Sequence, residues 1–426
     1  MNFKKTVAIA TAVGALAALS VPAMAMENEF HGMYRLRGMM SNYENSAGGV
    51  SPTLAAFEQR ARLQYIAKAS NDLKLVTHFE IDSSWGEVAY GNGRGTGGAI
   101  GADTVNLETK NVYLDFNCPL TGANVKVGIQ PLTDAFKGIF VNADMAGIVA
   151  SKKVGGVTAT AGFSRLFDYA AAGATGKNTQ DLFLLDAKLA VSKDLTLGGA
   201  YYLLRDNTVA ALKSSDSLDV HMVGVNAAAK FGIITADAFV AYQGGSELAA
   251  TGRDLSAFAG QVAVKANLDK AGNVSGRVLF TSGGKATDSK AKAWQSVGNH
   301  SGSSENSYYE ANMLLLMRSA YAMDSDKAII STSNNGNHGV TLLAAGYDNK
   351  LTDKVGVSAN IGYAMYSQKD AAANASIGTE LNAQVDYKLF SNLTASLQAA
   401  YVVLGDGASK TADDPYLAGV MFNYTF

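Results

Sequence analysis

Arginine side chains recur at alternate positions in two early stretches of the chain, where they could bind anions. Arg35 and Arg37 are two residues apart, as are Arg60 and Arg62. If both stretches are β-strands, each pair of arginines shares one face of its strand. A hairpin register would bring Arg37 near Arg60. The same register would bring Arg35 near Arg62.

Two carboxylates on the next expected strand, Glu80 and Asp82, share the face that carries the arginines. Like charges directly across a ladder are destabilising, so four arginines need water, counterions or acids around them. The residues therefore support two interpretations. The arginines form a basic stripe that attracts and orders anions, or they form a neutralised network that stiffens a wall.

Other chemistry has little support in the sequence. There is no GxSxG or HExxH motif, the five histidines are isolated, and Cys118 is the single cysteine, so we expect no catalytic site, no metal site and no cofactor. Gly93, Gly95 and Gly98 spell GxGxxG without a strand-turn-helix context, which favours a surface loop over a nucleotide site. A net charge of −2 and a pI near 6.2 argue against nucleic acid as a partner.

The elements that must position the charged residues alternate with a period of two. From Ser376 to Leu389 one face is mostly apolar and the other is polar, as in a strand with one face toward lipid and one toward water. Only 17% of the 426 residues are charged, below the roughly 25% usual for soluble domains. After residue 25 no apolar run approaches the roughly 18 residues of a membrane helix. The pattern predicts an all-β, transmembrane antiparallel up-and-down β-barrel rather than a soluble β-sandwich.

Counting the alternating segments predicts eighteen strands, with sixteen as the alternative because residues 105–116 and 146–153 are poorly patterned. Short and long connections alternate along the chain, as they do when the two barrel ends face different compartments. Residues 282–337 are too long for a bare loop, and Tyr308 to Arg318 could form a helix or an extra hairpin. The expected strands are 29–40, 57–69, 73–82, 105–116, 124–131, 146–153, 157–167, 181–191, 195–205, 218–229, 233–243, 256–267, 273–281, 338–348, 355–367, 376–389, 393–404 and 415–426.

The first 25 residues are typical of a cleaved export signal. Lys4 and Lys5 precede an apolar stretch from Thr6 to Val21, and Ala23-Met24-Ala25 forms a small-x-small cleavage site. We expect residues 1–25 to be removed and residues 26–426 to form a single barrel, with a long extracellular segment at about 282–337.

The end of the chain resembles that of a known family. The last expected strand ends on Phe426, with Tyr424 and Phe422 at alternate positions before it. A terminal Phe preceded by alternating aromatics, in an exported alternating chain, resembles the assembly signal of the Gram-negative outer-membrane porin family. The resemblance implies a water-filled barrel of sixteen to eighteen strands in the outer membrane, in contact with the lipid bilayer and lipopolysaccharide. It also implies insertion by the barrel-assembly machinery and, often, a homotrimer.

Residues 131–146, PLTDAFKGIFVNADMA, resemble the loop that folds into the pore in that family. The resemblance implies that Asp134 and Asp144 lie across from the arginine stripe and create a transverse field, with Lys137 as a local modifier. The pore-lining residues expected on all these grounds are Arg35, Arg37, Arg60, Arg62, Glu80, Asp82, Asp134 and Asp144.

The function predicted from these features is passive diffusion of small hydrophilic solutes and ions. One alternative is a barrel sheath for an electron conduit, in which a separate multihaem cytochrome is the partner. Another is a membrane enzyme such as a lipase or protease, but no Ser-His or Asp-His constellation can be assembled from the pattern.

Overall fold

A computed structural model describes residues 26–43, 50–88, 97–101, 107–168, 176, 178–208, 217–247, 252–297, 308, 310–317, 328–369, 374–408 and 413–426. The expected export signal, residues 1–25, lies outside the described residues. In these described ranges eighteen strands follow one another, and a 3-10 turn, η1 (Asp269–Ala271), lies between β12 and β13. The strands are β1 (Glu27–Tyr43), β2 (Val50–Ser70), β3 (Leu73–Ser84), β4 (Glu108–Asn117), β5 (Asn124–Thr133), β6 (Asn142–Val154), β7 (Val157–Asp168), β8 (Thr179–Ser192), β9 (Leu195–Asp206), β10 (Leu218–Phe231), β11 (Ile234–Ser246), β12 (Asp254–Asn267), β13 (Asn273–Thr281), β14 (Val340–Lys350), β15 (Val355–Met365), β16 (Ser376–Phe390), β17 (Leu393–Leu404) and β18 (Tyr416–Thr425).

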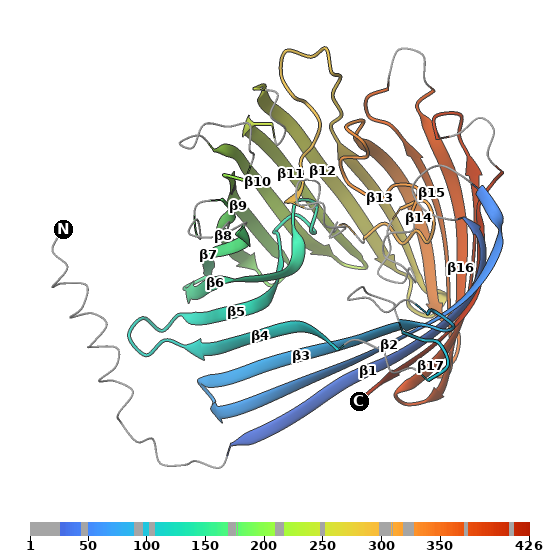
Figure 1. Cartoon of the computed structure of the whole chain (residues 1–426), viewed down its shortest axis with the longest axis horizontal. Coiled ribbons are helices and arrows are strands. Elements are labelled where there is room, and N and C mark those ends of the chain that lie inside the picture. The colour runs from blue at the N-terminus through green and yellow to red at the C-terminus, as the bar shows by residue number, and fades with distance from the viewer. Residues whose placement is uncertain are drawn as a thin grey trace.

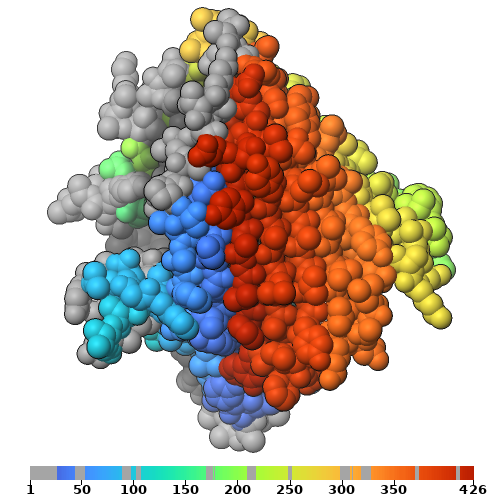
Figure 2. Space-filling model, turned by 90° about the vertical axis from the view of Figure 1, so that its right-hand side faces the viewer, coloured from blue at the N-terminus to red at the C-terminus, as the bar shows by residue number. Residues whose placement is uncertain are grey.

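The strands form one closed antiparallel barrel. Each strand pairs with its neighbours in the chain, and β1 also pairs with β18. Figure 1 shows the strands following one another around the wall, and Figure 2 shows β1, in blue, lying against the red C-terminal strand. The expected barrel of eighteen strands is confirmed, and the alternative of sixteen is wrong.

Side chains of the outer wall are apolar and exposed. Leu381, Leu397 and Val225 expose 58%, 61% and 58% of their surface, because alternate residues of each strand point away from the lumen. A belt of this kind suits lipid, and open sheet edges are avoided by closure. Among the described residues no helix is long and apolar enough to cross a membrane.

Connections at the two barrel ends differ in length. Residues 71–72, 155–156, 193–194, 232–233 and 391–392 form tight turns at one end, whereas residues 85–107, 169–178, 207–217 and 282–339 connect strands at the other. In transmembrane barrels the short turns face the periplasm and the long loops face the exterior. The long connections therefore lie at the end that this rule predicts to face the exterior.

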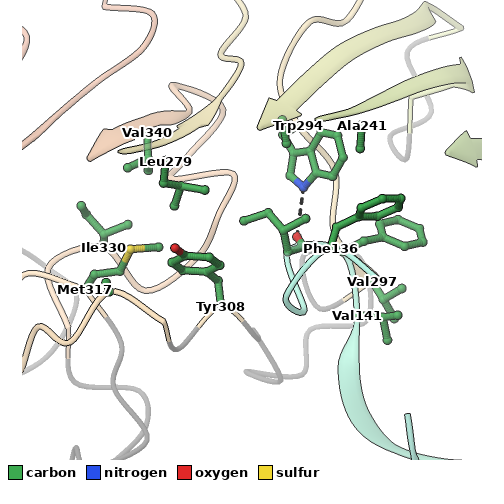
Figure 3. Packing of buried hydrophobic residues seen from close by; sticks show 14 of the residues in the cluster. Phe136, Val141, Ala241, Leu279, Trp294, Val297, Tyr308, Met317, Ile330 and Val340 are labelled. Atoms are coloured by element: carbon green, nitrogen blue, oxygen red, sulfur yellow. Dashed lines mark hydrogen bonds between the residues drawn. The ribbon is translucent and has the colours of Figure 1, made fainter. Parts of the chain in front are cut away.

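Two of the long-end connections fold inward and pack in the lumen. Residues 134–141, between β5 and β6, contribute Phe136, Ile139 and Phe140, which are almost fully buried. Trp294, from the connection between β13 and β14, is also buried and donates its indole N–H to the Ile139 carbonyl at 3.0 Å (Figure 3). These side chains form one hydrophobic cluster with inward-facing residues of the wall. The alternation predicts that the polar inward side chains face water, but one part of the inner wall is a packed apolar core.

The segment from Tyr308 to Met317 is neither a helix nor a strand in its described residues. Met317 forms an isolated bridge with Ile330, and Ile329 and Ile330 donate their N–H groups to the carbonyls of Leu315 and Leu316. The expected helix or extra hairpin is therefore replaced by an irregular segment whose apolar side chains pack inside the barrel. Burial of these side chains contributes to ordering the segment, together with its backbone hydrogen bonds.

Candidate pore-lining site

The arginines lie on one inward-facing patch of β1 and β2, as expected, but in a different register. Arg35 is opposite Arg60, and Arg37 is opposite Glu58. The expected pairing of Arg37 with Arg60 and Arg35 with Arg62 was displaced by two residues. The turn lies between Tyr43 and Val50 and not midway between the expected strand limits of 40 and 57, and an irregularity between Ser41 and Tyr43 shifts the register again. Neither feature is visible in the alternation of residue types.

Two of the four arginines are neutralised by the acids of β3. Arg60 lies directly opposite Asp82 and donates from Nε and Nη2 to its two carboxylate oxygens, at 2.6 and 2.5 Å. Arg62 lies opposite Glu80 and forms an ion pair with it. Glu80 also lies 3.6 Å from Arg60. The network interpretation therefore describes Arg60, Arg62, Glu80 and Asp82.

Within the described ranges, Arg35 and Arg37 on β1 lack the ion pairs that Arg60 and Arg62 form. Arg37 is 97% buried (3% exposed), and its three guanidinium nitrogens have no hydrogen-bond partner among the described residues. No acid lies within ion-pair distance of Arg35 in the part of the chain that the structure describes. The guanidinium nitrogens of Arg37 are closed off from solvent, with Glu58 directly opposite on β2. Arg37 therefore adds positive charge to this part of the wall without presenting its N–H groups to the lumen.

Asp134 has a structural environment that its sequence context did not predict. Its carboxylate is buried and accepts the backbone N–H groups of Phe136 and Gly138 at Oδ1 and of Phe140 and Val141 at Oδ2, at 2.7 to 3.0 Å. These four contacts close residues 134–141 into a compact turn. In contrast to the expectation, the carboxylate points into its own loop and not toward the arginines.

Asp144 lies on the outward side of β6. It shares that side with Ile148, which is 51% exposed, whereas Met145 on the other side is buried. Its carboxylate accepts from Lys110 at 2.5 Å and from Asn111 at 2.7 Å. The structure therefore does not bring Asp144 to the arginine patch, because the strand begins at Asn142 and fixes the side to which residue 144 points.

The inward loop is held against the wall by polar contacts. The Ala135 N–H donates to the Tyr202 hydroxyl at 2.8 Å, and the Asn226 amide donates to the Ala135 carbonyl at 3.2 Å. Lys137, at the tip, lies 3.3 Å from Asp237. A cavity of about 480 Å³ adjoins the loop, with Lys188 and Glu310 also in its lining. The loop therefore leaves a polar space between itself and β8–β11.

Glu380 anchors the second inward segment, and this role was not predicted from the sequence. It is fully buried on the inward side of β16, and its carboxylate accepts the backbone N–H groups of Leu314, Leu315 and Leu316 at 2.6 to 3.0 Å. This contact fixes the second inward segment to the wall. An acid at one inward position of an alternating strand gave no signal that it would bind backbone 64 to 66 residues away.

The expected assembly signal lies at the closing seam. Phe422 and Tyr424 are on the outer wall, 40% and 37% exposed, and the Tyr424 and Phe426 rings stack with centroids 5.5 Å apart. Phe426 and Gly32 exchange two backbone hydrogen bonds, at 2.8 and 3.0 Å. A Cβ atom at Gly32 would lie 2.3 Å from the Phe426 ring, so glycine at this position makes room for the terminal aromatic.

No group of three or more histidine, cysteine, aspartate or glutamate side chains in the described ranges could hold a metal ion. No protein-family model matches the sequence, and no curated protein is a significant sequence match. Solved structures, in contrast, match over almost the whole chain.

Pseudomonas aeruginosa OpdK, an outer-membrane protein, superposes with a TM-score of 0.60 at 12% identity, covering 93% of this chain and 99% of OpdK. The fold is that of an outer-membrane porin. P. aeruginosa OccK3 (OpdO) gives a TM-score of 0.58 at 12% identity, covering 93% of this chain and 96% of its own. P. aeruginosa OpdQ gives 0.58 at 9% identity, covering 94% and 98%. The shared fold confirms the barrel and supports the outer-membrane location expected from the sequence.

Proposed function

We propose that this porin-fold barrel is an open channel through which small hydrophilic solutes and ions diffuse across the outer membrane. The observation that carries the proposal is the arginine patch of β1 and β2. Arg35 and Arg37 place positive charge on the inward side of a closed barrel, and no ion pair to an acid neutralises Arg35 among the described residues. Rings and stripes of charged side chains set ion preference in pores. We therefore propose that the channel favours anions.

The inner wall of the barrel has an apolar part and a charged part. The inward segments pack on an apolar wall that includes Leu184, Tyr202 and Met222, and the arginine patch lies on β1–β3. A permeating solute would be confined between the filled part and the charged part. This confinement supports a selective channel in place of a wide one. The sheath alternative needs room for a second protein in the lumen, and no observation here favours it.

Barrel-assembly machinery and a homotrimer remain predictions from the resemblance. The solute is also open to test. One solved structure of OpdK contains vanillate, and this supports including an aromatic carboxylate among the first probes of the present channel.

The test replaces Arg35, Arg37, Arg60 and Arg62 together with Gln and measures the reversal potential in a salt gradient across a planar bilayer. Removing four positive charges should leave Glu80 and Asp82 dominant, so the reversal potential should move toward cation selectivity. The shift should shrink as salt is raised, because the Debye length falls from about 8 Å at physiological ionic strength to about 3 Å at 1 M.

A matched control is Arg165→Gln, which removes an arginine from the outer wall and should leave the reversal potential unchanged. An unmoved reversal potential in an open quadruple variant would contradict the proposed role of the patch. Lower thermal stability with unchanged selectivity would mean that the arginines serve only as scaffold.

A further inference from the structure

Three successive rows of outward side chains on β7–β10 change from apolar to charged toward the extracellular end. The antiparallel registers define each row across four strands. The rows are Ala161, Leu185, Tyr201 and Val223; then Phe163, Phe183, Leu203 and His221; then Arg165, Asp181, Arg205 and Asp219.

All three rows face away from the lumen. Phe183, Leu185 and Val223 are 39%, 58% and 54% exposed, whereas Leu182 and Met222, on the opposite side of the same strands, are fully buried in the inner cluster. Connections 169–178 and 207–217 follow the charged row. The charged row therefore lies where the apolar belt of the barrel meets the outer-leaflet headgroups.

The charged row contains the same arrangement twice. Arg165 binds Asp181 through Nε and Nη2, at 2.8 and 3.0 Å, and the Thr179 hydroxyl donates to the same carboxylate at 3.1 Å. Arg205 binds Asp219 through Nε and Nη2, at 3.0 and 2.9 Å, and the Ser217 hydroxyl donates at 3.1 Å. In both copies an arginine is held by an aspartate whose oxygens are also bound by a hydroxyl two residues earlier.

Each copy presents its cation to the outside. The Arg165 and Arg205 side chains are 41% and 45% exposed, against 11% and 23% for Asp181 and Asp219. The bidentate contacts use Nε and Nη2 and leave Nη1 outside them. Arg165 Nη1 lies 3.9 Å from Asp168 Oδ2, so Arg205 is the more open of the two. The row is neutral in formal charge, but its exposed surface is mainly guanidinium.

We propose that this row binds the phosphate groups of the outer-leaflet glycolipid, lipopolysaccharide. Guanidinium binds phosphate through charge-assisted hydrogen bonds, and an arginine already fixed by a carboxylate loses less side-chain entropy on binding. Arg165 and Arg205 stand two strand spacings apart, about 10 Å, which allows two phosphates to bind side by side. The apolar rows below would contact the acyl chains. The proposal rests on the outer-membrane location and is independent of channel activity.

A second copy of the chain is the competing occupant, because alternating Arg and Asp side chains could pair with another such row. Phosphate is favoured because the aspartate oxygens are already bound within the barrel, which leaves few acceptors for a partner's arginines. The oligomeric state of the variants below distinguishes the two occupants.

The test measures binding of lipid A, with both phosphates, to the full-length folded barrel in detergent, beside the same lipid with its phosphates removed. The double variant Arg165→Gln/Arg205→Gln should bind phosphorylated lipid A at least tenfold more weakly and the phosphate-free lipid unchanged. Arg253→Gln is the matched control. Arg253 also holds an acid, Glu247, through Nε and Nη2, but its Nη1 donates to loop carbonyls, so this variant should bind as the original protein does.

A second variant separates phosphate binding from loss of structure. Asp181→Asn/Asp219→Asn removes the same ion pairs but keeps both arginines, and it should retain or increase the affinity for phosphorylated lipid A. Equal loss in both double variants, or equal binding of the two lipids by the original protein, would overturn the proposal. A change in oligomeric state without a change in lipid affinity would overturn it in favour of a second copy.

Discussion

Arg35 on β1 and Arg60 on β2 lie directly opposite each other, so two like charges meet across one ladder. Such a pair is destabilising by a few tenths of a kcal/mol to about 1 kcal/mol. Arg60 is turned toward Asp82 and bound to both of its oxygens. Arg35 therefore carries the charge that the wall does not neutralise, and the two arginines should respond differently to the same substitution.

Arg60→Gln should lower the free energy of unfolding by about 2 kcal/mol, because it removes the two charge-assisted hydrogen bonds that Arg60 donates to the buried Asp82 carboxylate. Arg35→Gln should leave stability unchanged or raise it by up to about 1 kcal/mol, because it removes a repulsion. Urea unfolding of the two variants in lipid vesicles measures both effects. Equal destabilisation would show that Arg35 has a structural partner of its own.

Strand number and face could be predicted because both follow from the alternation of residue types. The predicted side of a residue was wrong where one extra residue enters a strand. Strict alternation from Ser376 to Leu389 predicts that Ile377 shares the apolar, lipid-facing side with Leu381. A register shift beside Gly378 turns Ile377 inward instead, and it is 1% exposed. Register could not be predicted for the same reason, since bulges and turn geometry displace a strand without changing its pattern.

The arginines and acids on β1–β3 could be predicted from the sequence, but the contacts of the inward loops could not. Asp134 and Glu380 bind backbone N–H groups, and an N–H group gives no residue-type signal in a sequence. The partners of Glu380 are also far away in the chain, so no local spacing indicates them. What the sequence showed was that residues 282–337 were too long for a bare loop.

Asp134→Asn should loosen the inward loop. The substitution replaces one of two acceptor oxygens with an NH₂ group that faces two backbone N–H donors, and we expect a loss of about 2 kcal/mol. Thermal unfolding should show the loss, and single-channel current should become noisier as residues 134–141 move. Asp144→Asn, which removes an ion pair on the outer side, should cost about 0.5 kcal/mol and leave the current unchanged. Equal effects would contradict the anchoring role of Asp134.

Glu380→Gln should release the second inward segment. One oxygen could still accept from Leu314, but the amide nitrogen would face the N–H groups of both Leu315 and Leu316. A loss of about 2 kcal/mol would raise the open population of the segment about 30-fold, and limited proteolysis between residues 310 and 317 should quicken accordingly.

The matched variant for Glu380 is Asp386→Asn, further along the same strand. Asp386 accepts from Gln384 and Ser396, both on the wall, so its loss should not change cleavage in the inward segment. Unchanged cleavage in Glu380→Gln as well would mean that apolar packing alone holds the segment.

Leu397 and Gln398 are adjacent on β17 and test the two faces separately. Leu397 is 61% exposed on the outer wall, whereas Gln398 donates to Gln384 on the inner side at 2.6 Å. Leu397→Arg should cost about 2 to 4 kcal/mol in a bilayer, and Gln398→Arg should cost less than about 1 kcal/mol. Reversible unfolding from vesicles measures both. Equal costs would contradict the assignment of faces.

Deletion of Phe426 should slow insertion into the outer membrane, because it removes both the terminal aromatic and the two hydrogen bonds to Gly32 that close β18 on β1. Phe426→Tyr keeps the aromatic ring and the backbone and should insert normally. The folded fraction in cells, compared with spontaneous folding of the urea-unfolded chain into vesicles, separates two causes. A targeting signal predicts a large loss in cells and a small loss in vesicles, since vesicles contain no assembly machinery. A purely structural role predicts the same loss in both, and normal yield in cells would remove the terminal Phe as evidence for the resemblance.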